Sequence, residues 1–324
     1  MRLVAATFAV MLLAFASRAV ARSDAEFEID GGKIEIEFAS HPSEALRKLV
    51  IAWVTTSARA VTVYYQQFPV SHVQIRIRFF DGQGVRSGRT TGWDGASIAI
   101  SVGNSTTATD FADDWMMTHE MVHLAFPSVA DQHHWIEEGS ATYVEPIARA
   151  RAGDLTPEKV WGDLVDGLPQ GLPKPGDRGL DFTPTWGRTY WGGALFCFLA
   201  DIEIRKRTGN EKGFEDALRA VLKAGGTIES VWKLTRAIEI ADNATGVPVL
   251  RELYDKMKAT PMSVDLNAIW KELGVKRHGG TTELDDSAPL AAIRKAITLS
   301  RTTSPSTSRS GPAFTLSARA YEAH

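Results

Sequence analysis

The feature that most constrains this chain is the stretch Thr118–Phe126, which reads THEMVHLAF. It places His119 and His123 four residues apart, with Glu120 directly after the first histidine. Residues at positions i and i+4 of a helix lie on the same face, so both imidazoles can bind one metal ion. Glu120 is rotated by about 100° from them, because a helix has about 3.6 residues per turn. The spacing therefore predicts a metal site in which Glu120 is a base beside the metal and not a ligand.

The residues around this stretch indicate that the histidines face the interior. In a predicted helix from Asp110 to about Phe126, Phe111, Trp115 and Val122 fall on the same side as the histidines. Histidines buried without a partner would cost free energy, and a metal ion supplies that partner.

A catalytic zinc site needs a third protein ligand, and the stretch His133–Glu145, HHWIEEGSATYVE, offers several candidates. We expect Glu138 to be the ligand, because it lies near the start of the next predicted helix, which can turn back beside the first. Glu137 is a competitor, about 100° around that helix. His133 and His134 are weaker competitors, because they fall in the predicted turn. The sequence thus predicts Zn²⁺ as the cofactor.

These two blocks resemble those of the gluzincin metallopeptidases, and most closely the aminopeptidase N and glycyl aminopeptidase-like families (peptidase MA-like). In those families the second block reads approximately W-x-x-E-G-x-A-x-Y, which matches WIEEGSATY in this chain. The resemblance implies that Glu138 is the third zinc ligand and that Glu145 orients a zinc histidine from outside the ligand set. It covers roughly residues 60–225.

A third block, GRTYWGGALF at Gly187–Phe196, is similar to the Y-x-K-G-A-like block of the same families. The resemblance implies that Tyr190 stabilises the oxyanion formed on the substrate carbonyl, although Gly192 replaces the family lysine. We expect Trp186, Arg188 and Trp191 to line the substrate pocket. The alternative for the two tryptophans is that both pack in the core.

The resemblance implies zinc-dependent peptide hydrolysis, in which Glu120 activates a zinc-bound water and the substrate is a peptide or protein. Aminopeptidases of this group carry a G-x-M-E-N-like strand whose glutamate holds the substrate amino terminus. The equivalent strand is expected to be GASIAISVG, Gly95–Gly103, which has no carboxylate but can pair with substrate backbone at a sheet edge. Aminopeptidase and endopeptidase activity therefore both stay open. A catalytically inactive zinc-binding module and a hydrolase of a non-peptide amide are the alternatives.

Composition and periodicity predict an α+β fold. With 324 residues, 44% hydrophobic residues and a net charge of −3, the chain is globular and not of a nucleic-acid-binding type. Residues 22–105 are predicted to form a small mixed-sheet subdomain, and residues 106–298 a mainly helical zinc-peptidase-like subdomain. The expected strands and helices are a hairpin around Gly31-Gly32, strands at 73–80 and 96–103, and helices at 43–67, 110–126, 135–149, 189–208, 211–224, 228–241, 247–258 and 265–273.

The two ends of the chain have a different composition. Arg2, the apolar run Leu3–Phe15 and the small residues Ala19 and Ala21 predict a cleaved signal peptide at 1–21, with an uncleaved anchor as the alternative. We therefore expect a secreted or periplasmic protein without stable membrane insertion after cleavage. Residues 299–324 are rich in Ser, Thr and Arg and are predicted to be disordered. The sequence does not indicate an oligomeric state.

Overall fold

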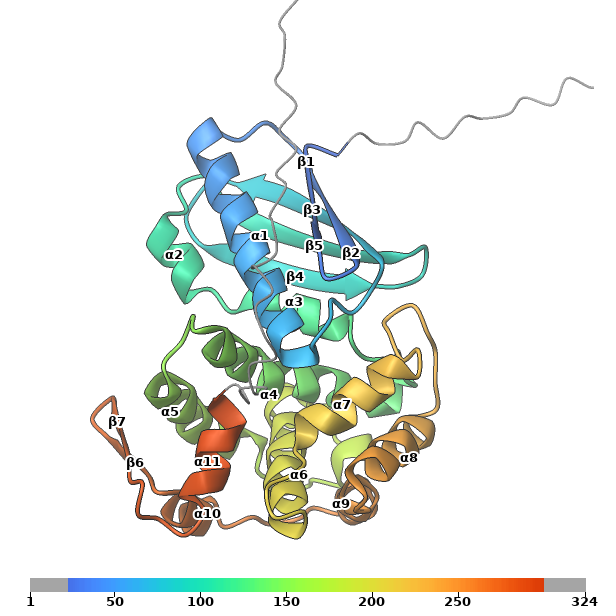
Figure 1. Ribbon diagram of the computed structural model, residues 1–324, viewed down its shortest axis with the longest axis vertical. Coiled ribbons are helices and arrows are strands. Elements are labelled where there is room, and N and C mark those ends of the chain that lie inside the picture. The colour runs from blue at the N-terminus through green and yellow to red at the C-terminus, as the bar shows by residue number, and fades with distance from the viewer. Residues whose placement is uncertain (1–22, 300–324) are drawn as a thin grey trace, which may run out of the picture.

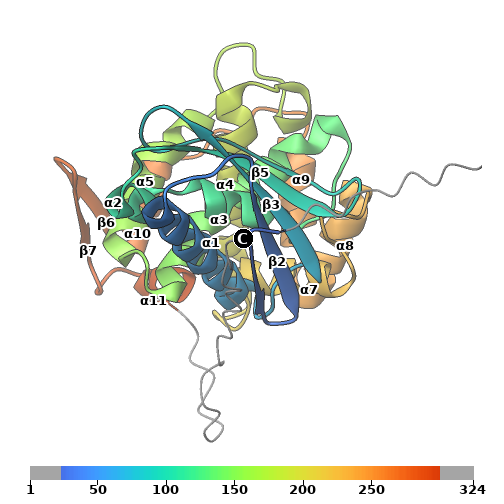
Figure 2. The same ribbon diagram turned by 90° about the horizontal axis from the view of Figure 1, so that it is seen from above.

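The computed structural model describes residues 23–299. The predicted signal peptide lies outside these residues, and so does the predicted tail apart from Leu299. Within the described range, no helix is both long and apolar enough to cross a membrane. Figure 1 shows a sheet with one long helix across it, above a larger group of helices, and Figure 2 shows the same arrangement from above. The predicted α+β architecture, with the sheet first and the helices after it, is confirmed.

The sheet has five strands in the order β1-β2-β3-β5-β4. The inner strands β2, β3 and β5 run parallel, and the edge strands β1 and β4 are antiparallel to their neighbours. The predicted hairpin and the two predicted strands are confirmed, whereas β4 was not predicted. The bounds are β1 Ala25–Ile29, β2 Gly32–Phe38, β3 His72–Phe80, β4 Val85–Thr91 and β5 Ala96–Gly103.

Helix α1 (Glu44–Tyr65) connects β2 to β3 and lies across one face of the sheet (Figure 1). Ser43 caps this helix, because its hydroxyl accepts a hydrogen bond from the amide of Leu46 at 3.2 Å. The sheet turns a row of fully buried aliphatic side chains towards this core. They include Ile34, Ile36, Ile75, Ile77 and Ile100.

The helix predicted from Asp110 to Phe126 is in fact two helices, α2 (Ala108–Asp113) and α3 (Met116–His123). Thr107 is the cap of α2, and its side chain and that of Asp110 form a reciprocal capping box. The break falls at Asp114, which is extended and whose carboxylate accepts a hydrogen bond from the amide of Met117 at 3.2 Å. Because a new helix begins here, α3 can take a direction of its own. Its histidines can therefore face a different helix from the one that α2 packs against.

The helical region surrounds α4 (His134–Ala152), which packs against α1, α3 and α6. Helices α4 and α6 to α10 were predicted to within a few residues at most ends. Helix α5, the β6–β7 hairpin and α11 were not. Their bounds are α5 Pro157–Gly167, α6 Gly193–Arg207, α7 Phe214–Lys223, α8 Leu234–Thr245, α9 Val249–Met257, α10 Leu266–Leu273, β6 Val275–His278, β7 Thr281–Leu284 and α11 Ala291–Thr298.

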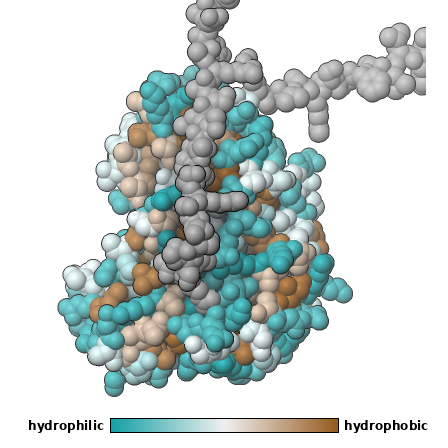
Figure 3. Space-filling model, viewed as in Figure 1, coloured by the Kyte–Doolittle hydropathy of each residue, from teal (hydrophilic) through white to brown (hydrophobic). Residues whose placement is uncertain are grey.

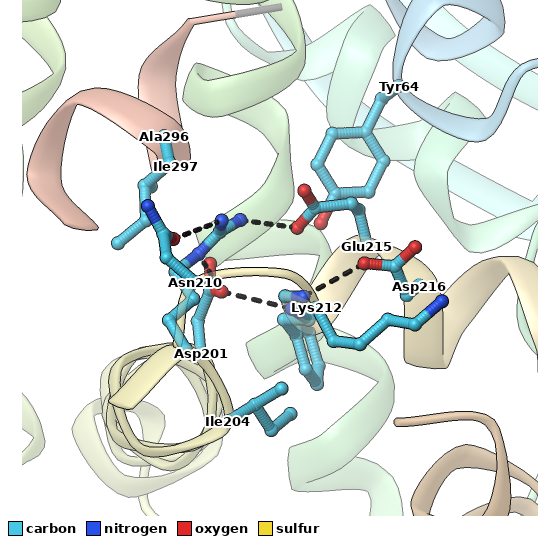
Figure 4. Close-up of polar contacts among 12 residues, drawn as sticks. Tyr64, Asp201, Ile204, Asn210, Lys212, Glu215, Asp216, Ala296 and Ile297 are labelled. Carbon is cyan, nitrogen blue, oxygen red and sulfur yellow. Dashed lines mark hydrogen bonds and ion pairs between the residues drawn. The ribbon is translucent and has the colours of Figure 1, made fainter. Parts of the chain in front are cut away.

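A buried ionic cluster joins four of these helices (Figure 4). Arg205 of α6 contacts Asp201 at 2.7 Å and Glu215 of α7 at 2.6 Å. Arg151 of α4 contacts Glu215 at 3.2 Å and donates a hydrogen bond to the carbonyl of Ile297 in α11 at 2.9 Å. Buried charges are tolerated when they are paired and hydrogen-bonded, so the cluster fixes the packing of α4, α6, α7 and α11. On the face shown in Figure 3, hydrophilic and hydrophobic residues are mixed.

Candidate metal centre

Two neighbouring helices bring the three predicted ligands to one point. His119 and His123 lie on α3, and Glu138 lies in the second turn of α4. The Oε2 atom of Glu138 is 3.1 Å from Nε2 of His119 and 3.6 Å from Nε2 of His123. One ligand atom from each residue lies within 4.8 Å of the others. The described residues thus contain a His-His-Glu group that could hold a metal ion.

The chemistry of this group fits Zn²⁺. Two imidazole nitrogens and one carboxylate oxygen are a usual donor set for catalytic zinc. Burial lowers the pKa of His119, which favours the neutral form that binds a metal. Burial opposes ionisation of Glu138, but hydrogen bonds with His119, His123 and His134 outweigh it and lower the pKa of this carboxyl.

His123 behaves differently from His119. Burial lowers its pKa too, but the hydrogen bond to Glu138 and the nearby carboxylates outweigh burial and raise it. The Glu138 carboxylate therefore favours a positive charge at this point, which a bound cation would supply.

Close backbone contact brings a third segment to this point. A Cβ atom on Gly139 of α4 would collide with the backbone of Gly193, and one on Gly193 would collide with the carbonyl of Trp135. Only glycine at both positions permits this approach. It places the π-helical turn η4 (Arg188–Gly192), which begins the predicted 189–208 helix, beside the histidines. Such turns are frequent at functional sites.

Tyr190 lies in that turn, and its ring is parallel to the ring of His119 with 6.3 Å between centroids. Its ring also stacks on that of Trp186, with 5.7 Å between centroids. Burial, together with the negative charge and hydrogen bond of Glu138, raises the pKa of Tyr190 to about 12. The phenol therefore stays protonated at neutral pH and can donate a hydrogen bond.

Glu120 is buried on the side of α3 that faces β4. The Thr90 hydroxyl lies 2.7 Å from Oε2 of Glu120 and 2.8 Å from its backbone carbonyl, and it can donate a hydrogen bond to either. A Cβ atom on Gly88 would collide with the same carboxylate. Edge strand β4 therefore fixes the orientation of Glu120, which is not one of the three metal-facing residues.

The prediction that the strand Gly95–Gly103 pairs with substrate is wrong in its choice of strand. That segment contains β5, whose two edges are both occupied, one by β3 and the other by β4. Among residues 23–299, the edge of the sheet without a strand partner beside the site belongs to β4, where the amide of Gly88 donates a hydrogen bond to Sδ of Met116 at 3.0 Å. Sequence reasoning missed β4 because VRSGRTT has a glycine and no alternation of apolar and polar residues.

The competing ligands point elsewhere. Glu137 accepts a hydrogen bond from the amide of Val129 at 2.8 Å, and His133 is paired with Asp181 at 3.0 Å. His134, a weaker candidate ligand by sequence, contacts Glu138 through the other carboxylate oxygen, with 3.2 Å between Nε2 and Oε1. Its Nδ1 atom lies 2.7 Å from Glu137. The i,i+4 spacing of His134 and Glu138 was a signal in the sequence for this contact.

The role expected for Glu145 is not what the structure shows. Its carboxylate pairs with Arg149 at 2.9 Å, and Arg149 also donates a hydrogen bond to the carbonyl of Ala112 at 2.7 Å. Burial raises the pKa of Glu145 to about 7. Glu145 therefore helps to join α4 to the end of α2 and does not contact a ligand histidine.

Of the three expected pocket residues, Trp186 is the most exposed, with 61% of it open to solvent. Arg188 is buried and forms an ion pair with Asp177 at 2.8 Å, so it secures the connection that precedes η4. The ring of Trp191 is partly buried and packs closely over Gly167, so the core alternative holds for Trp191 but not for Trp186. Trp115, expected to be buried, is 48% exposed, and its ring lies 5.2 Å from that of His119.

Comparison with known proteins gives a likeness in structure but not in sequence. No family profile matches the chain, and no curated protein sequence matches it. An aminopeptidase N family protein from Idiomarina loihiensis superposes with a TM-score of 0.59 at 14% identity, over 77% of this chain and 49% of that one. The chain therefore has the fold of that protein and spans about half its length.

Weaker matches include an M1 zinc metallopeptidase from Deinococcus radiodurans. It superposes with a TM-score of 0.48 at 15% identity, over 75% of this chain and 52% of that one. A two-domain M1 zinc metallopeptidase bound to arginine gives a TM-score of 0.47 at 15% identity, over 75% of this chain and 54% of that one.

Proposed function

We propose that this chain is a zinc-dependent peptide hydrolase of the gluzincin type that acts in a secreted or periplasmic setting. The observation that carries the proposal is the convergence of His119, His123 and Glu138 on one point. Glu120 of α3, which Thr90 of β4 contacts, and Tyr190 of η4 lie beside that point. A purely structural metal site has no use for a buried carboxylate held beside it, so the arrangement favours catalysis over an inactive zinc-binding module.

In this proposal Zn²⁺ would be held by His119, His123 and Glu138, and it would supply a Lewis acid that lowers the pKa of water and polarises a carbonyl. Glu120 accepts the proton of the attacking water on its carboxylate and passes it to the leaving amine. Thr90 keeps that carboxylate in one orientation. Tyr190 donates its hydroxyl proton in a hydrogen bond to the oxyanion as it forms.

The free edge of β4 supports a peptide as the substrate. An extended peptide can add to an exposed sheet edge through backbone hydrogen bonds. Because Gly88 and Thr90 of β4 both contact Glu120, a peptide paired there would pass the general base. The exposed ring of Trp186 lies on the η4 side of the site and would contact substrate side chains.

A screen of mixed peptides with the zinc-loaded mature protein tests this proposal. We expect cleavage that a chelator abolishes and that added zinc restores. A protein that holds zinc but cleaves none of the peptides would favour the inactive module. Mass analysis of the products would separate removal of single amino-terminal residues from internal cleavage.

His134 is expected to set the metal affinity through Glu138. Its contact with Oε1 leaves Oε2 as the oxygen that faces both histidines. Loss of an outer partner of a metal ligand weakens metal binding by about 10- to 100-fold. We therefore expect His134→Ala to raise the zinc Kd by about that factor, measured by competition with a chromophoric chelator. His72→Ala is the matched control, because His72 is an exposed histidine on β3 that pairs with Glu35. Equal zinc Kd values for the two variants would contradict this role.

A further inference from the structure

Edge strand β4 carries an exposed arginine next to the proposed catalytic base. Arg89 lies between Gly88 and Thr90, the two residues that contact Glu120. Across the ladder, Arg86 lies opposite Ser101 of β5 and Arg89 lies opposite Ala99, and a β-bulge between the two arginines keeps both of them on the outer face of the sheet. Ala99 is a small residue, and it leaves the guanidinium of Arg89 uncovered.

The neighbours of Arg89 are positive or neutral. Arg78 and Arg86 are exposed and flank Ser101 on the same outer face. Glu37 on this face is already paired with Arg76 at 3.0 Å. Within residues 23–299, no ion pair or hydrogen bond of the Arg89 side chain is found. The positive charge of Arg89 is thus free to meet a ligand.

Arg86 is different, although it lies on the same strand. Its guanidinium lies over the ring of Phe80 on β3, 4.4 Å from the centroid. Because β5 separates β3 from β4, Arg86 leans across the sheet and away from the free edge. Arg89 is therefore the arginine of β4 that an added strand would meet.

The free edge also has no negative charge of its own, since Val85–Thr91 contains neither Asp nor Glu. A peptide paired with β4 would place alternate side chains on the outer face, about 5 Å from their neighbours on β4. A carboxylate at such a position would meet Arg89, which is suited to hold it with two parallel hydrogen bonds. A lysine or arginine there would be repelled.

We infer that the preferred substrates are peptides with an acidic side chain close to the scissile bond, recognised by Arg89. This inference rests on the proposed function. Because Arg89 lies between the two residues that contact Glu120, we place the acidic residue within about two positions of the cleaved bond.

The test uses sets of peptides that differ only in carrying Glu, Gln or Lys at one position near a bond that the zinc-loaded protein cleaves. For wild type we expect kcat/KM for the Glu peptide to exceed that for the Gln peptide by about 2- to 5-fold at low salt, as is usual for an exposed charge pair. We expect the Lys peptide to be the slowest, and the Glu preference to shrink as salt is added.

Arg89→Gln is expected to bring the Glu peptide down to the rate of the Gln peptide. Arg86→Gln is the matched control, and it should keep the Glu preference. Equal rates for Glu and Gln peptides in wild type would overturn the inference and leave peptide hydrolysis standing. A preference that survives Arg89→Gln would overturn the assignment to Arg89. Failure of the loaded protein to cleave any peptide would overturn both the inference and the proposed function.

Discussion

Replacing Glu120 with glutamine is expected to leave the protein folded and able to bind zinc, but to lower kcat by about 100- to 10,000-fold. Glutamine has nearly the same shape as glutamate and keeps an oxygen that can accept the hydrogen bond from Thr90. It cannot accept the proton of the attacking water at neutral pH. Because Glu120 is outside the metal-facing group, its replacement should not remove a ligand.

The measurement is kcat and metal content on the same preparation. Glu158→Gln is the matched control, because Glu158 is an exposed glutamate on α5. We expect this control to keep wild-type turnover. A Glu120→Gln protein that carries zinc and still has near-normal kcat would rule out Glu120 as the general base.

Replacing Glu138 with alanine is expected to have the second large effect, which is loss of the metal and of turnover with it. Loss of an outer partner already costs about 10- to 100-fold in metal affinity, so loss of a ligand should cost more. The change also leaves His119 and His123 without the carboxylate that both contact. We expect the zinc Kd to rise in the order wild type, His134→Ala, Glu138→Ala. A Glu138→Ala protein that binds zinc as tightly as His134→Ala would contradict this order.

The metal group could be predicted from the sequence because its geometry is mostly local. The spacing of His119 and His123 fixes their common helix face, and the block around Glu138 limits the third ligand to a few neighbours. Contacts from outside α4 decide which of Glu137 and Glu138 faces the two histidines. The main one is the hydrogen bond that the amide of Val129 donates to Glu137.

The errors came from non-local contacts and from competition between local ones. Strand β4 has little strand propensity and forms because β5 offers a partner, which the sequence does not reveal. Glu145 was given a role at the metal by resemblance, but Arg149 lies four residues further on and pairs with it. The sequence pattern predicts one helix where the structure has α2 and α3. It does not reveal that the carboxylate of Asp114 accepts a hydrogen bond from the amide of Met117 and so begins a new helix.

The most direct test of the central claim is the zinc content of the purified mature protein, wild type beside Glu138→Ala. The proposal predicts about one zinc per wild-type chain and little in the variant, with both proteins folded by circular dichroism. No zinc in wild type after incubation with the metal would contradict it, and so would a full complement of zinc in Glu138→Ala. Either of these results would mean that His119, His123 and Glu138 do not form a metal centre.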